Sequence, residues 1–203
     1  MIELKSLTVK RERRTILHDV ELSWPRGALA IVGANGSGKS TLLRAIAGAI
    51  AIDRGDVSIE GRSLQTARSD AQRRLALVPE EPSYPGHLAV RELLELCAGL
   101  RCAKVPDDAR SRETLAIIGA QRYETLSLGQ RKRAHLLFAR VGEVPWWLLD
   151  EPSDGLDARA RESLFEEIAA LPSGALVATH DPVLIARCDG VVRIVDRTVV
   201  RER

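Results

Sequence analysis

Aromatic residues and cysteines are scarce in this chain of 203 residues. Phe, Trp and Tyr together make up 3% of it, so its core must be built mainly from aliphatic side chains, as in α/β proteins with buried strands. The three cysteines are Cys97, Cys102 and Cys188. They are odd in number and have none of the spacings of a metal site, which indicates reduced thiols and a cytoplasmic location.

Long apolar runs and an excess of one charge are also missing. No stretch approaches the about eighteen uninterrupted apolar residues of a membrane-spanning helix. Lys and Arg number 30 and Asp and Glu 28, which gives a net charge of +2. A nucleic-acid-binding domain usually carries a strong basic excess, so we expect no nucleic-acid partner.

The chain does contain a glycine-rich run at residues 33–41, which fits the pattern G-x-x-x-x-G-K-[ST] without mismatch. In such a loop the backbone N–H groups point at one anion, while Lys39 adds charge at the outer phosphates and Ser40 offers a hydroxyl to Mg²⁺. An apolar strand precedes the run and apolar residues at helical spacing follow it, so the phosphates would lie at a helix N-terminus. The residues expected to bind them are Gly33, Asn35, Gly36, Ser37, Gly38, Lys39, Ser40 and Thr41.

Strands and turns are predicted around this loop. Residues 2–9 and 15–22 alternate between apolar and polar and predict a hairpin across a polar turn at residues 10–14. A turn is predicted at residues 53–56. Further strands are predicted at residues 28–32, 57–60, 76–79, 146–149 and 175–178, with a hairpin at 191–200.

A helical block interrupts this pattern. Apolar residues in residues 87–143 recur at three- and four-residue steps, and the block lies between two predicted strands. We therefore predict an α/β fold: a phosphate-loop ATPase core with a mixed sheet, an antiparallel β subdomain and an inserted α-helical subdomain. The chain would be one domain over residues 1–203, with its core at 1–86 and 144–203 and the helical subdomain at about 87–143.

Two carboxylates, Asp150 and Glu151, end the apolar strand at residues 146–149. In a phosphate-loop ATPase the first can hold Mg²⁺ through its waters, and the second can polarise a water for attack on the γ-phosphate. Strand ends with two acids are common, so this pair alone is weak evidence of a site. Together with the phosphate loop in the same chain, it indicates one.

A further helix is predicted to begin in residues 126–130, Leu-Ser-Leu-Gly-Gln. Ser127 and Gln130 have the spacing of a capping box, and Gly129 leaves the free N–H groups of the helix start uncovered. Taken by itself, this run fits a simply capped helix as well as a second helix start that faces an anion.

Together and in this order, the motifs resemble those of ABC-transporter ATP-binding subunits, as do residues 153–157 and 179–181. The resemblance covers essentially the whole chain, and residues 126–130 are similar to the family signature LSGGQ with Leu128 in place of the first glycine. It implies a head-to-tail dimer around two ATP molecules. In this dimer the signature of one subunit would face the γ-phosphate of the ATP that the other subunit binds. The signature residues are Ser127, Leu128, Gly129 and Gln130.

The same resemblance implies roles for individual residues. Glu151 would be the catalytic carboxylate, and His180 would contact the γ-phosphate and the attacking water. Asp157 would cross the dimer interface. Ser40 and Asp150 would hold Mg²⁺.

The chain departs from the family pattern at two places. Glu80 stands where the family usually has Gln; a carboxylate can accept the metal or its waters but cannot donate a hydrogen bond as Gln can. The turn at residues 10–14 lacks the aromatic residue that usually stacks on adenine, and the guanidinium of Arg11 or Arg13 would take its place.

One cassette with a short helical block favours a transporter subunit over the ABC ATPases of DNA repair or translation. We expect a peripheral protein on the inner face of the cell membrane, which drives a separate permease docked along residues 80–87. Residues 147–152 resemble the ATP-binding subunits of haem exporters, and Glu80 resembles small exporter ATPases; we therefore favour export, with haem as one candidate cargo. The alternative is a non-catalytic nucleotide-binding regulator, which would need a damaged Glu151 or His180.

Overall fold

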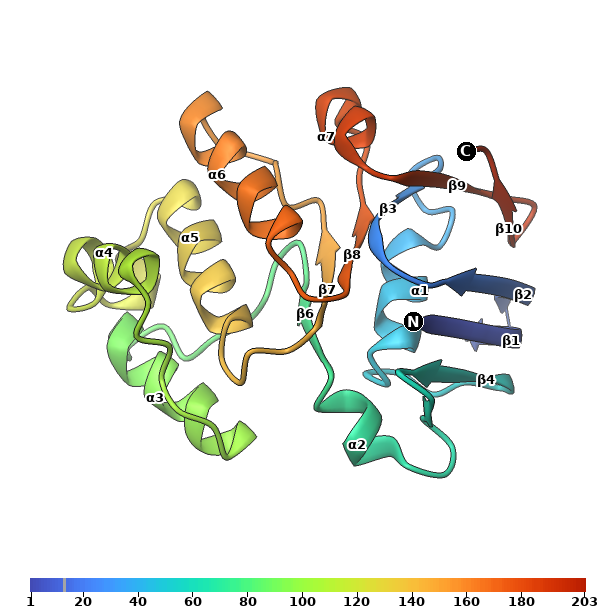
Figure 1. Cartoon of the computed structure of the whole chain (residues 1–203), viewed down its shortest axis with the longest axis horizontal. Helices are drawn as coiled ribbons and strands as arrows, with labels where there is room; N and C mark the ends of the chain where they lie inside the picture. The colour runs from blue at the N-terminus through green and yellow to red at the C-terminus, as the bar shows by residue number, and fades with distance from the viewer. Residues whose placement is uncertain (13) are drawn as a thin grey trace.

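Two β-sheets with helices between and around them organise the computed structural model, which describes residues 1–12 and 14–203 (Figure 1). The larger, central sheet has six strands in the order β10-β9-β3-β8-β7-β6. Strand β10 runs antiparallel to β9 and the other neighbouring pairs are parallel, which confirms the predicted mixed sheet. The strands are β3 (Gly27–Val32), β6 (Leu75–Val78), β7 (Trp146–Asp150), β8 (Gly174–Ala178), β9 (Gly190–Val195) and β10 (Thr198–Arg201).

The smaller sheet is antiparallel, in the order β2-β1-β4-β5. Its strands are β1 (Ile2–Arg11), β2 (Arg14–Trp24), β4 (Arg54–Ile59) and β5 (Arg62–Ser63). The predicted turn at residues 53–56 is wrong for most of its length, because β4 begins at Arg54, which pairs with Thr8. Ladder hydrogen bonds use main-chain groups, so charged side chains do not prevent pairing when they can stand in solvent.

The first hairpin also pairs further than predicted. Lys10 pairs with Thr15 and Arg11 with Arg14, so the polar turn at residues 10–14 is mostly strand. Arg13 lies outside the described residues. The predicted pairing of the two strands is confirmed, and the turn lies within the predicted residues but is shorter than predicted, with Glu12 in the turn conformation.

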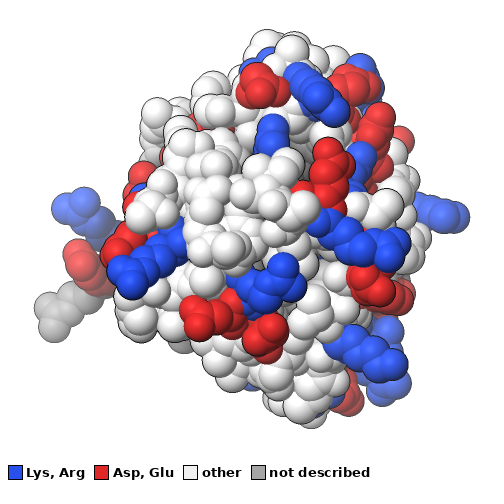
Figure 2. Space-filling view, turned by 90° about the vertical axis from the view of Figure 1, so that its left-hand side faces the viewer, with Lys and Arg blue, Asp and Glu red and all other residues white. Residues whose placement is uncertain are grey.

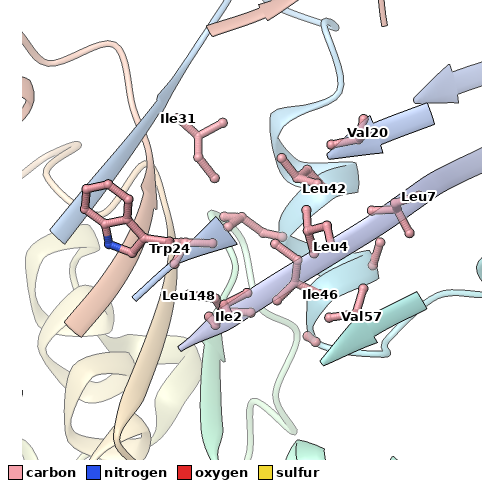
Figure 3. Close-up of a cluster of buried hydrophobic side chains, with 14 of the residues drawn as sticks. Ile2, Leu4, Leu7, Val20, Trp24, Ile31, Leu42, Ile46, Val57 and Leu148 are labelled. Carbon is pink, nitrogen blue, oxygen red and sulfur yellow. The ribbon is translucent and has the colours of Figure 1, made fainter. Parts of the chain in front are cut away.

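Helix α1 (Lys39–Ile46) lies between the two sheets, and α6 (Ala158–Ala169) and α7 (Pro182–Arg187) cover the other face of the central sheet (Figure 1). Figure 3 shows the aliphatic core around α1, to which both sheets contribute buried side chains. Helix α2 (Arg68–Gln72) was not predicted from the sequence. Ala71 is its one buried residue, so it has no apolar periodicity to detect.

Three helices form what we call the helical arm: α3 (Val90–Arg101), α4 (Ala109–Ile118) and α5 (Leu128–Ala139), with a short 3₁₀ turn η1 (Tyr123–Thr125). The arm has a hydrophobic cluster of its own. Asp108 caps α4 by accepting hydrogen bonds from the backbone N–H groups of Arg110 and Ser111. On the face shown in Figure 2, basic and acidic side chains are interspersed around an uncharged area.

Ion pairs join the helical arm to α6. Arg110 contacts Glu166 at 2.7 Å and Glu167 at 3.1 Å, and Arg140 contacts Glu167 at 3.1 Å. Across the described ranges 1–12 and 14–203, the helices are all too short or too polar to span a bilayer.

Candidate active site

The carboxyl ends of β3, β7 and β8 meet at one edge of the central sheet. These strands are parallel and in register: Ala178 of β8 is level with Ile31 on one side and with Asp150 on the other. Ligands of open α/β sheets bind at this edge. A pocket of about 460 Å³ opens here. It is lined by Ile16, Asn35, Gly36, Gly38, Lys39, Ser40, Thr41, Glu80, Asp150, Glu151, Asp154 and His180.

The glycine-rich loop delivers the backbone of α1 to this pocket. Gly38 precedes the helix with φ of 110°, a left-handed conformation that favours glycine. A Cβ atom there would also lie 3.2 Å from the side chains of Ile16 and Leu17. No side chain of the described residues caps α1, so the N–H groups of its first turn remain available to an anion.

Lys39 is held against the loop. Its side chain is nearly buried, and Nζ donates to the carbonyl of Gly33 at 2.9 Å, with the carbonyl of Ala34 at 3.4 Å. Both acceptors are neutral carbonyl groups, and neither is a carboxylate. The loop therefore carries a cation beside uncapped N–H groups, an arrangement suited to phosphates.

Asp150 is buried, and its Oδ1 atom has no hydrogen-bond partner in the part of the chain that the structure describes. Burial raises the pKa of this carboxyl, and the Ser40 hydroxyl and the charge of Lys39 act in the opposite direction. Glu80 lines the same pocket. The unpaired oxygen of Asp150, the hydroxyl of Ser40 and the carboxylate of Glu80 line one pocket, and oxygen donors of this kind are those that Mg²⁺ prefers, so these residues fit that ion.

Glu151 and His180 are joined by hydrogen bonds. Oε2 of Glu151 lies 3.0 Å from Nδ1 of His180 and accepts from its backbone N–H at 3.3 Å. The hydrogen bond to Glu151 and the charge of that carboxylate raise the pKa of His180. The carboxylate is nearly buried while the imidazole is largely exposed, so His180 can meet a ligand that enters from solvent.

The residues of the signature-like run lie at the start of α5. Ser127 and Gln130 form the predicted capping box: Ser127 Oγ accepts from the Gln130 N–H at 3.3 Å, and Gln130 Oε1 accepts from the Ser127 N–H at 2.9 Å. Leu128 is 60% exposed and lies over Gly155, where a Cβ atom would be 2.6 Å from its Cδ2. Leucine in place of the first signature glycine is thus accommodated by a glycine in a neighbouring loop. Gly129 is half-buried behind it.

Two further predicted residues, Asp157 and Arg11, lie outside the pocket, whereas the unpredicted Ile16 lies in its lining. Asp157 caps α6, with Oδ1 accepting from the Ala160 N–H at 2.7 Å. Arg11 ends β1 with an exposed side chain and is not among the residues that line the pocket. Ile16 lines the pocket instead.

Sequence reasoning missed Ile16 and Asp154. Ile16 lies in an alternating strand far from the phosphate loop in sequence, and its packing against Gly38 is visible only in the structure. Asp154 had a local signal, since it follows the two carboxylates by a few residues in a polar loop.

The sequence of this chain is similar to those of known ATP-binding proteins. The ABC transporter family matches residues 17–154. The chain is 33% identical to the cytochrome c biogenesis ATP-binding export protein CcmA of Xanthomonas campestris, over 89% of this chain and 86% of the relative. It is also 33% identical to the hemin import ATP-binding protein HmuV of Pseudomonas putida, over 95% of this chain and 82% of the relative.

Solved structures with the same fold include an ATP-binding subunit of an ABC transporter, with a TM-score of 0.87 and 26% identity over 100% of this chain and 89% of that one. A dimeric ATP-binding cassette bound to ADP and Pi matches with a TM-score of 0.86 over 100% of this chain and 98% of that one; at 22% identity it supports the fold. This chain therefore belongs to the ABC transporter family, as an ATP-binding and ATP-hydrolysing subunit.

Proposed function

We propose that two copies of this chain pair head to tail around two ATP molecules. One observation carries the proposal: the phosphate-loop pocket and the start of α5 occupy separate places on one chain. Residues 127–130 are absent from the described lining of the pocket. A second copy related by a twofold axis can present its own α5 start to each pocket and so complete two equivalent sites.

In this arrangement the phosphate loop and Lys39 bind the phosphates, and Glu151 accepts a hydrogen bond from the attacking water and polarises it. His180, bonded to Glu151, contacts the γ-phosphate. Mg²⁺, held by Ser40 and Asp150 with Glu80 nearby, would supply positive charge to the phosphate oxygens. Asp157 would contact the second copy where α6 begins.

Complementation between two inactive chains tests the pairing. Lys39→Ala removes the phosphate-binding cation, and Ser127→Arg places a bulky side chain at the start of α5. We expect each variant alone to lose nearly all ATP hydrolysis. In an equal mixture, half of the dimers contain one intact site formed by Lys39 of one chain and Ser127 of the other. The mixture should therefore recover up to about a quarter of the wild-type rate, measured as phosphate release.

The outcome depends on where Ser127 acts. If it acted in its own chain, the mixed dimer would have no intact site and the mixture would stay as inactive as its components. Lys104→Ala, at an exposed lysine between α3 and α4, is the matched control and should leave the rate unchanged.

We further propose that the subunit drives a membrane permease as an exporter, with haem as one candidate cargo. A groove of about 440 Å³ lies between residues 80–84 and the helical arm and offers a docking site; Leu128 and Arg131 are among the residues that line it. A 33% identical relative is an export protein of cytochrome c biogenesis, and another is a hemin importer, so relatives exist with both directions.

Inside-out membrane vesicles distinguish these directions. In them the ATPase faces the medium, so an exporter accumulates haem in the vesicle interior when ATP is added. We expect this accumulation with the wild-type subunit and its co-purified permease, and none with Glu151→Gln. ATP-driven loss of preloaded haem would instead indicate import, and failure of any permease to co-purify from membranes would contradict the transport role.

A further inference from the structure

Lys132 is a buried lysine with no part in the nucleotide pocket, although it lines the groove proposed above as a docking site. It lies in the first half of α5, five residues after Ser127, and its side chain is 4% exposed. It is absent from the lining of the nucleotide pocket among the residues that the structure describes. Lysine is almost never buried to this extent unless its ammonium is paired, so its surroundings need an explanation.

The ammonium of Lys132 bonds to main-chain carbonyls of two active-site segments. Nζ donates to the carbonyl oxygen of Glu151 at 2.9 Å and lies 3.4 Å from that of Glu80. One side chain of the helical arm thus bridges two segments: the one that follows β6 and the one that follows β7. Both strands belong to the central sheet.

The backbone at Glu151 needs such support. Its φ is +45°, in the left-handed region that side chains other than glycine rarely adopt. A residue in this conformation persists only when its surroundings hold it. The N–H of Glu151 donates to the carbonyl of Ala178 in β8 at 2.9 Å, and its C=O accepts from Lys132. The peptide groups on both sides of the carboxylate are therefore fixed, one by the sheet and the other by the arm.

Charge explains how the ammonium is tolerated. Burial lowers the pKa of Lys132, while the carboxylates of Asp154, Glu80, Asp150 and Glu151 act in the opposite direction. Taking an ammonium out of water carries a large desolvation cost, which its hydrogen bonds and the nearby carboxylates must offset. A contribution to stability alone therefore explains this lysine poorly.

We propose that Lys132 is a positioning residue that ties the helical arm to the backbone of Glu151 and thereby sets the geometry of the catalytic carboxylate. The proposal rests on the role of Glu151 given above. Because Lys132 shares α5 with Ser127, a displacement of this helix also moves the ammonium relative to the carbonyl of Glu151. Contact at the start of α5 and the alignment of the carboxylate are linked through one side chain.

Lys132→Met tests this role, because methionine keeps the length of the side chain and removes the donor. We expect kcat for ATP hydrolysis to fall about ten- to a hundredfold, as small displacements of catalytic groups do. KM for ATP should change by less than about twofold, since Lys132 does not line the pocket. The Tm should fall by a few degrees because the carbonyl of Glu151 loses its donor, so kcat and KM are measured well below it. Lys104→Met, at an exposed position between α3 and α4, is the control and should match the wild type.

A double variant separates an effect through Glu151 from an independent one. If Lys132 acts through the carboxylate, adding Lys132→Met to Glu151→Gln should lower kcat little further. An undiminished kcat in Lys132→Met, or a full further loss in the double variant, would overturn the proposal. If Lys132→Met does not fold, Lys132→Gln replaces it in the test. The glutamine amide can donate but its side chain is shorter than that of lysine, so kcat should again fall. A wild-type kcat in Lys132→Gln would contradict the proposal.

The failure of the underlying role looks different. If Glu151→Gln hydrolyses ATP normally, the catalytic role of Glu151 is wrong, and with it the role of Lys132. If Glu151→Gln is inactive while Lys132→Met is normal, the role of Lys132 alone is wrong.

Discussion

Glu151→Gln is expected to lower kcat for ATP hydrolysis about a hundred- to a thousandfold, the range typical of a lost general base. The amide has nearly the shape of the carboxylate but no negative charge with which to polarise water. The phosphate loop and Lys39 are untouched by this change, so ATP should still bind. Because bound ATP is no longer consumed, the variant should also form a longer-lived dimer.

Phosphate release under saturating ATP measures the first effect, and light scattering with and without ATP measures the second. Glu95→Gln makes the same chemical change on the exposed face of α3 and should leave both unchanged. A Glu151→Gln chain with more than about a tenth of the wild-type kcat would exclude this residue as the general base.

Trp146→Ala is expected to cost about 3–5 kcal/mol of unfolding free energy, the range for truncating a buried aromatic side chain. Trp146 begins β7 and is fully buried in the core between the two sheets. Its Nε1 also donates to Glu60 Oε1 at 2.7 Å, in a carboxylate that accepts from the N-terminal amine at 2.7 Å and from Ser173 Oγ at 3.1 Å. The substitution leaves a cavity and removes one bond of this cluster.

Urea unfolding followed by circular dichroism measures the loss as a lower midpoint at an unchanged slope. Trp146→Phe retains most of the volume and should lose less than half as much. Leu100→Ala, at a side chain that is 78% exposed, should change the free energy by less than about 0.5 kcal/mol. If Trp146→Phe or Leu100→Ala lost as much unfolding free energy as Trp146→Ala, the loss in Trp146→Ala would not come from the packing of this core side chain.

The phosphate loop and the two carboxylates were predictable because their chemistry depends on residues close together in the chain. The glycine spacing in residues 33–41 determines the conformation of the loop. Asp150 and Glu151 come at the end of an apolar run that can be recognised as a strand from its own residues. The capping box at Ser127 was likewise readable, but its sequence alone could not say whether the helix start also faces an anion.

The site residues contributed by distant segments could not be predicted in the same way. Ile16 reaches the pocket because β2 passes beside the phosphate loop at Gly38, whereas Arg11, at the end of β1, is not among the lining residues. Glu80 and Asp150 line the same pocket because β6 and β7 are parallel neighbours, although many residues separate them in sequence.

The sequence by itself determined the chemistry of the phosphate loop, the strand and helix that flank it, and the likeness to the ABC transporter family, since each depends on local spacing and residue type. The tertiary structure alone decided which side chains face the nucleotide pocket and that Lys132 holds the carbonyl of Glu151. The physical reason is that such contacts depend on strand order and on the placement of the helical arm. These are set by the burial of side chains from segments far apart in the chain, which no short run of residues encodes.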